Sequence, residues 1–324
     1  MLRFIARVLT DKFFSRPSQE SLDERLDRML RHLRETGRAA AADRFLRYEE
    51  ETERLEHRDI EIEACDGAKL HGVLYPAEKP CSVYVVTVHG YRSSTEKDFA
   101  LQFDYLRSLG FNVLAVDQRA HGKSGGDYIC LGVKERHDLV SWLNTVKKID
   151  HSAVFVLYGI SMGSSTVLAS LEIIANGECS ASGELLANGE YSVKSRDIKA
   201  VVADCGYVSP DRQLMFMARR RTRLPVKGIL SAARKELLRK AGFDINAFDT
   251  ASILKKTSVP VLFVHGKKDR FVPIEFSYEN YEACASGYKR LLEVPDASHA
   301  GAYIRAEEAY KAEITSLLDA AGLM

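Results

Sequence analysis

A serine at the apex of a glycine-flanked turn is the feature that most constrains this chain. Residues 159–163 are Gly-Ile-Ser-Met-Gly, with an apolar run at residues 153–158 before them and small and apolar residues after them. This pattern predicts a strand, a sharp turn and a helix, with Ser161 in a strained conformation that lifts its Oγ above the sheet edge. Gly159 and Gly163 suit the close approach of strand and helix backbones at such a turn. The alternative is a small-residue turn in which Ser161 only caps the helix.

Two polar residues follow Ser161 at the ends of later predicted strands. Asp269 comes after the buried-strand pattern at residues 259–266, and His299 follows the strand-like residues 290–294. A nucleophilic serine needs a histidine that takes its proton and an acid that orients the histidine. After a G-x-S-x-G turn, the acid and then the histidine are expected later in the chain. The sequence therefore predicts a triad of these three residues. The alternatives are a helix-capping aspartate and a surface-loop histidine.

Two backbone N–H groups are candidates for stabilising the negative charge that forms during attack on a carbonyl group. The predicted helix after the serine directs its first N–H groups, including that of Met162, toward the nucleophile. A second donor normally comes from the loop after the third strand. Here a strand at residues 82–88 ends in a His-Gly-Tyr sequence, so we predict the N–H of Tyr91 as the second donor.

Predicted strands alternate with predicted helices from residue 57 onward. The predicted strands are residues 58–65, 69–75, 82–88, 112–117, 153–158, 198–204, 259–265 and 290–294. This alternation predicts an α/β fold in which helices flank a mostly parallel, eight-stranded sheet. The expected helices include residues 95–109, residues 133–149 and one long helix after His299. Ser161, Asp269, His299 and Tyr91 each follow the carboxyl end of a different predicted strand. Sheets of this kind place their active sites at that edge.

The chain resembles the α/β-hydrolase superfamily of serine hydrolases. The matching segments, in the family's order, are residues 89–91, 117–124, 159–163, 266–269 and 298–299, within a span of about 57 to 322. The most similar group is the bacterial peptidase-S33-like, or serine aminopeptidase-like, esterases. The resemblance implies the fold and the triad, whereas it says little about the substrate because one fold serves many chemistries.

These residues favour a carboxylesterase that cleaves small or medium acyl esters through an acyl-enzyme. The mechanism needs no metal and no organic cofactor, and its partner is a small-molecule acyl ester. A peptidase or amidase, a lipid-ester hydrolase and an acyltransferase could use the same triad. A scaffold that binds a partner without catalysis is the alternative from another class.

Two regions lie outside the predicted hydrolase core. Residues 1–56 form a predicted helical extension that precedes a hydrolase domain at residues 57–324, and two helices are expected at about residues 21–37 and 39–55. The extension could pack on the hydrolase body, serve as a lid, contact a second copy or lie on a membrane surface. A polar excursion at residues 176–197 is predicted to be exposed. No oligomeric state is predicted.

A cap is predicted at about residues 208–257, between the sixth and seventh strands. Met215 and Phe216 are candidates to contact an acyl chain. Residues 210–240 hold ten Lys or Arg against two acids, so Arg219 and its neighbours could attract an anionic substrate. The alternative is a set of solvated side chains on helix exteriors.

Composition limits the remaining function classes. The 324 residues carry a net charge of +1, which gives no basis for a nucleic-acid partner. No apolar run approaches the length of a membrane-spanning helix, and the first residues lack a secretory cleavage pattern. Six cysteines are scattered without metal-binding spacing. The expectation is a cytoplasmic protein.

Overall fold

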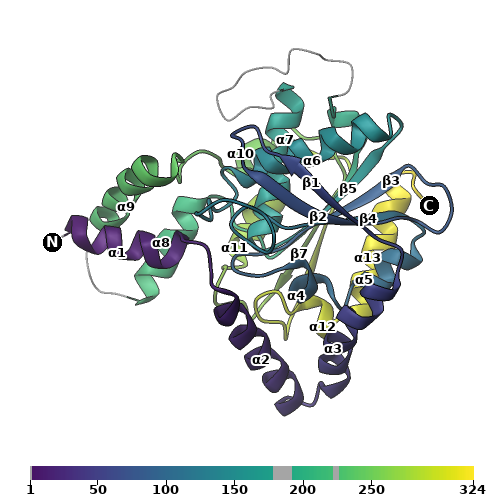
Figure 1. Ribbon diagram of the computed structural model, residues 1–324, viewed down its shortest axis with the longest axis horizontal. Coiled ribbons are helices and arrows are strands. Elements are labelled where there is room, and N and C mark those ends of the chain that lie inside the picture. Colours follow the sequence, from purple (N-terminus) through teal and green to yellow (C-terminus); the bar gives the residue numbers. More distant parts are fainter. Residues whose placement is uncertain (1, 178–191, 222–225) are drawn as a thin grey trace.

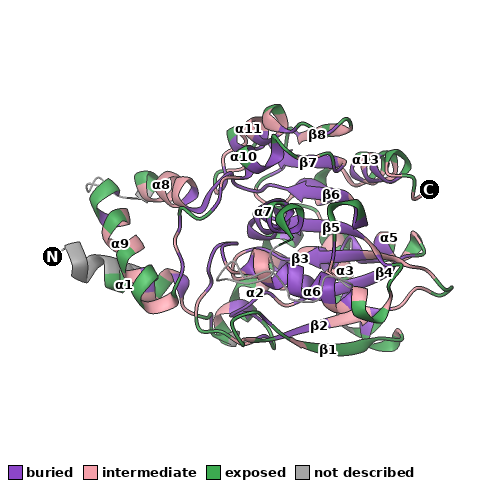
Figure 2. Ribbon diagram, turned by 90° about the horizontal axis from the view of Figure 1, so that it is seen from above, coloured by how far each residue is buried: buried purple, intermediate pink, exposed green. Residues whose placement is uncertain are grey.

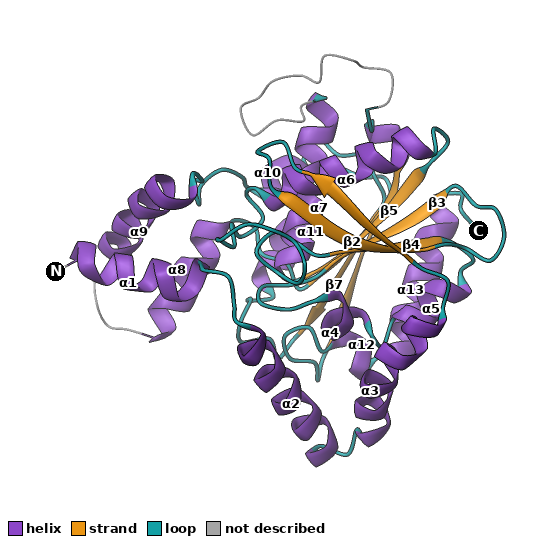
Figure 3. Cartoon of the chain, in the orientation of Figure 1, coloured by secondary structure: helices purple, strands orange, loops and turns teal. Residues whose placement is uncertain are grey.

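A mostly parallel sheet forms the centre of the protein in the computed structural model, which describes residues 2–177, 192–221 and 226–324 (Figures 1 and 3). Eight strands of the described residues pair in the order β1-β2-β4-β3-β5-β6-β7-β8. β2 is antiparallel to β1 and β4, and the other neighbours are parallel. The predicted α/β fold is confirmed. The strands are β1 (Arg58–Glu63), β2 (Lys69–Tyr75), β3 (Val83–Val88), β4 (Asn112–Val116), β5 (Val154–Ile160), β6 (Ile198–Asp204), β7 (Val261–Gly266) and β8 (Lys289–Val294).

Helices cover both faces of the sheet, so the central strands are buried on each side (Figure 2). Along β3, Val86 and Val88 pack into one apolar core and Val85 into the other, following the two-residue alternation of a strand. The helices are α1 (Leu2–Phe14), α2 (Gln19–Glu35), α3 (Ala39–Arg54), α4 (Thr95–Phe99), α5 (Phe103–Ser108), α6 (Glu135–Ile149), α7 (Met162–Asn176), α8 (Pro210–Arg221), α9 (Val226–Ala241), α10 (Thr250–Leu254), α11 (Glu275–Ala283), α12 (Ala302–Arg305) and α13 (Glu307–Ala320).

Two helices that the sequence predicts as continuous are each divided. The predicted helix at residues 95–109 is α4 followed by α5, because residues 99–103 are all buried and a single helix buries only one stripe. The predicted long helix after His299 is α12 followed by α13, because Ala306 leaves the helical region with φ −142° and ψ 47°. Neither division moves a candidate site residue.

The first helix packs on the cap rather than on the sheet. In Figures 1 and 2, α1 lies with α8 and α9 in a lobe beside the sheet, and α1 contacts α9. Asp11 pairs with Lys240 at 2.5 Å, and the rings of Phe14 and Phe243 lie 6.2 Å apart between centroids. The segment after α1 is anchored to the core, where Arg16 donates to two backbone carbonyls of residues 122 and 124.

The second and third helices pack on each other and on the sheet-containing body of the protein. Leu30, Leu33 and Ala42 form a small apolar cluster between them. Arg44 of α3 pairs with Glu307 of α13 at 3.0 Å. In the part of the chain that the structure describes, no helix is long and apolar enough to cross a membrane. Most of the predicted excursion at residues 176–197, and residues 222–225 of the cap, lie outside the described residues.

Candidate active site

Ser161 lies at the sharp turn between β5 and α7. Its backbone has φ 57° and ψ −116°, a conformation that residues with side chains rarely adopt. A Cβ added to Gly159 would collide with the Gly163 carbonyl, and one added to Gly163 would collide with the Val88 carbonyl. The Ser161 N–H donates to the carbonyl of Asp204 at 2.8 Å. Glycine at both positions is therefore a condition of this turn.

His299 lies between Ser161 and Asp269 with one ring nitrogen directed at each. Its Nδ1 lies 2.6 Å from Asp269 Oδ2, and its Nε2 lies 2.9 Å from Ser161 Oγ. An ionised carboxylate can only accept hydrogen bonds, so Nδ1 carries the proton and Nε2 accepts from the serine hydroxyl. The structure thus brings together the three residues that the sequence selects, from the ends of β5, β7 and β8.

Asp269 is buried, yet its surroundings keep it ionised. Burial opposes the charge, but hydrogen bonds from His265 and His299 outweigh it and hold the pKa of Asp269 well below its usual range. The N–H groups of Phe271 and Val272 also donate to its Oδ1, at 2.7 and 2.9 Å. The carboxylate is therefore fixed in place and able to orient a histidine.

A second buried carboxyl group lies behind the turn. Burial raises the pKa of Asp204 to about 6, against the hydrogen bond that Tyr310 donates to its Oδ2 at 2.9 Å. Tyr158 donates in turn to the Tyr310 hydroxyl at 2.7 Å. Asp204 supports the turn through its backbone carbonyl, while Asp269 is the carboxylate that contacts His299.

The loop after β3 lies beside Ser161. The N–H of Gly90 donates to Asp98 at 2.6 Å, and the N–H of Arg92 donates to His121 at 3.0 Å. Both groups are thus engaged away from the serine. Tyr91 lies between them in the chain and lines two pockets that adjoin Ser161. The Tyr91 N–H as an oxyanion donor stays a prediction.

A small apolar pocket adjoins the serine on the side of the cap. Its volume is about 40 Å³. The α1 helix supplies Phe13 and Phe14 to its lining, and α8 supplies Leu214 and Met217. The other lining residues are Tyr91, Leu131, Ser161, Tyr207, Gln213 and Phe271.

A second pocket that adjoins the serine is larger and more polar. Its volume is about 380 Å³, and its lining includes Ser161 and His299. Arg25, Leu26 and Met29 of α2 form part of its wall. The amino-terminal extension therefore contributes side chains to both pockets. The sequence alone does not predict this contribution, because an apolar stripe on a helix does not indicate which part of the protein it packs against.

The predicted cap contacts are distributed unevenly. Phe216 lines a separate pocket of about 220 Å³ with Met217, Arg220, Arg270 and Phe271. Met215 and Arg219 line none of the pockets described at or near Ser161. Gln213, Leu214 and Met217 share the helix face that does reach the serine, because residues three and four apart on a helix are neighbours.

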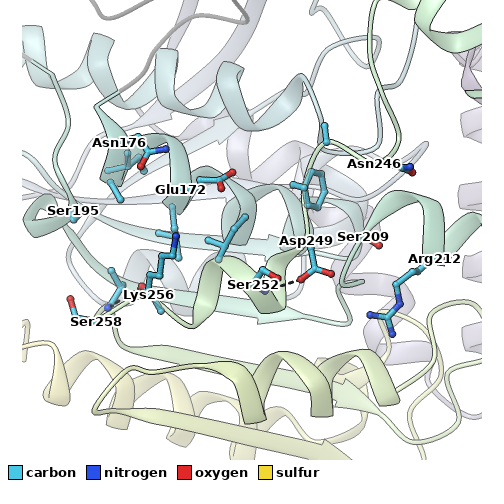
Figure 4. Close-up of a pocket in the computed structure, with 18 of the residues that line it drawn as sticks. Glu172, Asn176, Ser195, Ser209, Arg212, Asn246, Asp249, Ser252, Lys256 and Ser258 are labelled. Carbon is cyan, nitrogen blue, oxygen red and sulfur yellow. Dashed lines mark hydrogen bonds between the residues drawn. The ribbon is translucent and has the colours of Figure 1, made fainter. Parts of the chain in front are cut away.

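A cavity of about 740 Å³ lies away from the serine, among α7, α8 and α10 (Figure 4). Several of its charged groups form contacts that stabilise the fold. Arg212 forms two hydrogen bonds to Glu279, at 2.6 and 2.7 Å, and Asp249 caps α10 by accepting from the Ser252 N–H. None of the triad residues lines this cavity.

One group of described side chains has metal-binding atoms close together, namely Cys205, Asp269 and His299, within 4.8 Å of one another. Metal ligation would require a thiolate, and burial raises the pKa of Cys205 well above its ordinary value. The histidine and the aspartate are also bonded to each other. This chemistry fits a proton-transfer site better than a metal centre.

The profile of the alpha/beta hydrolase family matches residues 85–312. The chain belongs to the alpha/beta hydrolase family. The uncharacterized protein YqkD of Bacillus subtilis is 27% identical over 272 residues, which cover 83% of this chain and 82% of that protein. The uncharacterized protein YfhR of Escherichia coli K12 is 25% identical over 250 residues, covering 75% of this chain and 74% of YfhR.

Two solved structures illustrate the shared fold of this alpha/beta hydrolase. The Pyrococcus furiosus esterase Pf2001 is 23% identical with a TM-score of 0.62, covering 82% of this chain and 92% of its own. Est1E of Butyrivibrio proteoclasticus, solved with ferulic acid bound, is 20% identical with a TM-score of 0.57, covering 80% of this chain and 99% of its own.

Proposed function

We infer that this alpha/beta hydrolase is a serine carboxylesterase. The observation that carries the proposal is the pair of contacts made by His299, one to the Oγ of Ser161 at 2.9 Å and one to Asp269 at 2.6 Å. A serine hydroxyl is a weak nucleophile until a base takes its proton, and this base is held in the required orientation. The proposal agrees with the shared fold, because Pf2001, which has this fold, is an esterase.

The reaction follows from these contacts. His299 Nε2 takes the proton of Ser161 as Oγ attacks the ester carbonyl, and the N–H groups of Met162 and Tyr91 stabilise the oxyanion. The intermediate collapses as His299 returns the proton to the departing alcohol, which leaves an acyl-enzyme. Water, deprotonated by His299, then releases the acid and restores the serine. Loss of one oxyanion donor typically costs about a hundred- to thousand-fold in rate.

The small apolar pocket supports a short acyl chain. Its volume of about 40 Å³ is roughly three times the ~10–15 Å³ of cavity space that one water molecule needs, so it has room for a few carbon atoms. Phe13, Leu214 and Met217 offer it no charged group. Acetyl and butyryl esters are therefore favoured over long-chain esters, and a lipid-ester hydrolase is less well supported.

The test is hydrolysis of p-nitrophenyl acetate, butyrate and octanoate by the wild type and by Ser161→Ala. We expect turnover of the two short esters by the wild type, and at least a thousand-fold loss in the variant. Circular dichroism checks that the variant is folded. Equal rates for the two proteins would exclude Ser161 as the nucleophile. A wild type without activity on all three esters would instead favour the scaffold.

A further inference from the structure

The open pocket beside Ser161 carries an excess of positive charge. Arg25, Arg92 and Lys97 line it, and Asp98 is the one carboxylate among the described residues of its lining. Arg25 comes from α2, whereas the other three come from the loop after β3 and from α4. Three cations and one anion thus face a space of about 380 Å³ that also contains the reacting serine.

The single carboxylate is engaged with the loop and not with these cations at close range. Asp98 Oδ2 accepts from the Gly90 N–H at 2.6 Å, and its Oδ1 accepts from the Ser93 hydroxyl at 2.6 Å. The Lys97 ammonium donates to the backbone carbonyl of Leu22 at 2.6 Å, so it is held by a neutral group. These contacts fix the pocket wall. The nearby carboxylates of Asp23 and Glu96 offset part of the charge of Lys97, so the positive excess of the pocket rests mainly on the two arginines.

Arg25 is the cation best suited to meet a substrate. Its guanidinium donates to the backbone carbonyl of Arg92 at 3.2 Å, and among the described residues it forms no ion pair. Desolvation by its surroundings lowers the pKa of Arg25. Arg25 remains exposed while it lines the pocket.

Arg92 adds to the same field from deeper in the wall. Its Nη2 donates to the carbonyls of Lys12 and Ser15, while its Nε is buried without a hydrogen-bond partner. A guanidinium can donate five hydrogen bonds and suits a carboxylate or a phosphate better than any neutral group. Two guanidinium groups close to a nucleophilic serine therefore favour a ligand that carries negative charge.

We propose that the substrate is an ester whose alcohol part carries a carboxylate or phosphate, which Arg25 and Arg92 bind in the open pocket. This inference rests on the proposed esterase function. If the short acyl chain occupies the apolar pocket, the alcohol part is left with the charged one. The Arg25 side chain is then a specificity determinant, and it takes no part in proton transfer.

The test compares two acetate esters of the same shape, 4-acetoxybenzoate, which is anionic, and 4-acetoxybenzamide, which is neutral. The variant is Arg25→Gln, and the matched control is Arg28→Gln, an exposed arginine on the same helix that does not line the pocket. For each protein we take the ratio of kcat/KM for the anionic ester to kcat/KM for the neutral ester. Comparing this ratio between wild type and variant cancels the difference in leaving-group reactivity of the two esters.

The wild type should prefer the anionic ester. Arg25→Gln should lower kcat/KM for that ester by about ten-fold or more, the usual effect of losing a hydrogen bond to a charged group. The neutral ester should change by less than about two-fold, and Arg28→Gln should change neither. A p-nitrophenyl glutarate half-ester, whose charge lies on the acyl side, should be no better a substrate than the butyrate.

Equal effects of Arg25→Gln on the two acetate esters would overturn the proposal, as would a selective effect on the glutarate half-ester. These outcomes are distinct from a failure of the esterase assignment. If the neutral ester is hydrolysed through Ser161 without any charge preference, the esterase stands and the anionic substrate is rejected. A phosphorylated analogue, 4-acetoxyphenyl phosphate, distinguishes a phosphate from a carboxylate as the preferred anion.

Discussion

Two contacts of one imidazole ring define the chemistry of the candidate site. His299 packs against the ring of Phe271, with 4.9 Å between ring centroids, and this neighbour limits how the imidazole can turn. Phe271 also donates its N–H to Asp269 at 2.7 Å. One residue thus holds both the base and the acid that orients it, although only the base touches the nucleophile.

The sequence predicts much of this residue-scale arrangement, because the turn at Ser161 has a local signature. Gly159 is required by a collision with Gly163 four residues away, whereas Gly163 is required by a collision with Val88 of the neighbouring strand β3. The sequence does not predict the role of Phe271, since its contact with His299 joins loops far apart in the chain. The same holds for Asp204, whose place behind Ser161 depends on the pairing of β5 with β6.

Asp204 gives a pH-dependent contribution to stability. Its pKa is about 6 in the folded protein, above the ordinary value of 3.8, because burial disfavours the charge. The folded state therefore holds this proton more tightly than the unfolded state, and the group's contribution to stability declines as pH rises from about 4 to about 6. Asp204→Asn removes the titrating carboxyl group. The free energy of unfolding of the variant, relative to that of the wild type, should therefore rise by up to about 3 kcal/mol between pH 4 and pH 6.

Urea denaturation of both proteins at several pH values measures this difference. Asn can still accept the hydrogen bond from Tyr310, so the variant is expected to fold. Stability profiles that stay parallel between pH 4 and 6 would contradict the raised pKa of Asp204.

At the scale of elements, α1 connects the amino terminus to the candidate active site. Its last turn reaches the loop after β3, where the Tyr91 hydroxyl donates to the carbonyl of Phe13 at 2.5 Å. The chain then forms a β-bridge between Ser15 and Tyr128. These contacts hold Phe13 and Phe14 against the apolar pocket. We therefore regard α1 as part of the acyl-binding wall.

Phe13→Ala should allow the enzyme to accept esters with longer acyl chains. The substitution removes an aromatic ring from the lining of a pocket of about 40 Å³, so longer chains gain room. We expect kcat/KM for p-nitrophenyl octanoate to rise several-fold relative to butyrate. Val8→Ala on the same helix is the control, since Val8 is 47% exposed and lines neither pocket at the serine. An unchanged octanoate-to-butyrate ratio would remove Phe13 from the acyl site.

Several strand boundaries within the core follow from local patterns, whereas the division of two predicted helices and the packing partners of the amino-terminal helices do not. Strand β6 spans residues 198–204, as the sequence predicts. A short apolar run of this length is typical of a buried strand. An apolar stripe on α1 indicates that one face is covered without indicating by what. Its packing on α9 joins residues more than two hundred positions apart, which no local pattern encodes.

At the scale of the whole molecule, the amino-terminal extension and the cap both contribute to the pockets that adjoin Ser161. The α1 and α8 helices form the apolar side, and α2 with the loop after β3 forms the basic side. Besides the positive excess that the sequence shows in the cap, a second cationic group, formed by Arg25, Arg92 and Lys97, lines a pocket that includes Ser161. The net charge of the whole chain is only +1, so it does not indicate this local excess of positive charge.

The central claim is that Ser161 is an activated nucleophile, and covalent labelling tests it most directly. A fluorophosphonate reacts with serines that have a working base and oxyanion site. Incubated with the native protein, it should add one label per chain, and peptide mass spectrometry should locate that label on Ser161. Ser161→Ala should take up none. A wild type that stays unlabelled, or a label on another residue, would contradict the account.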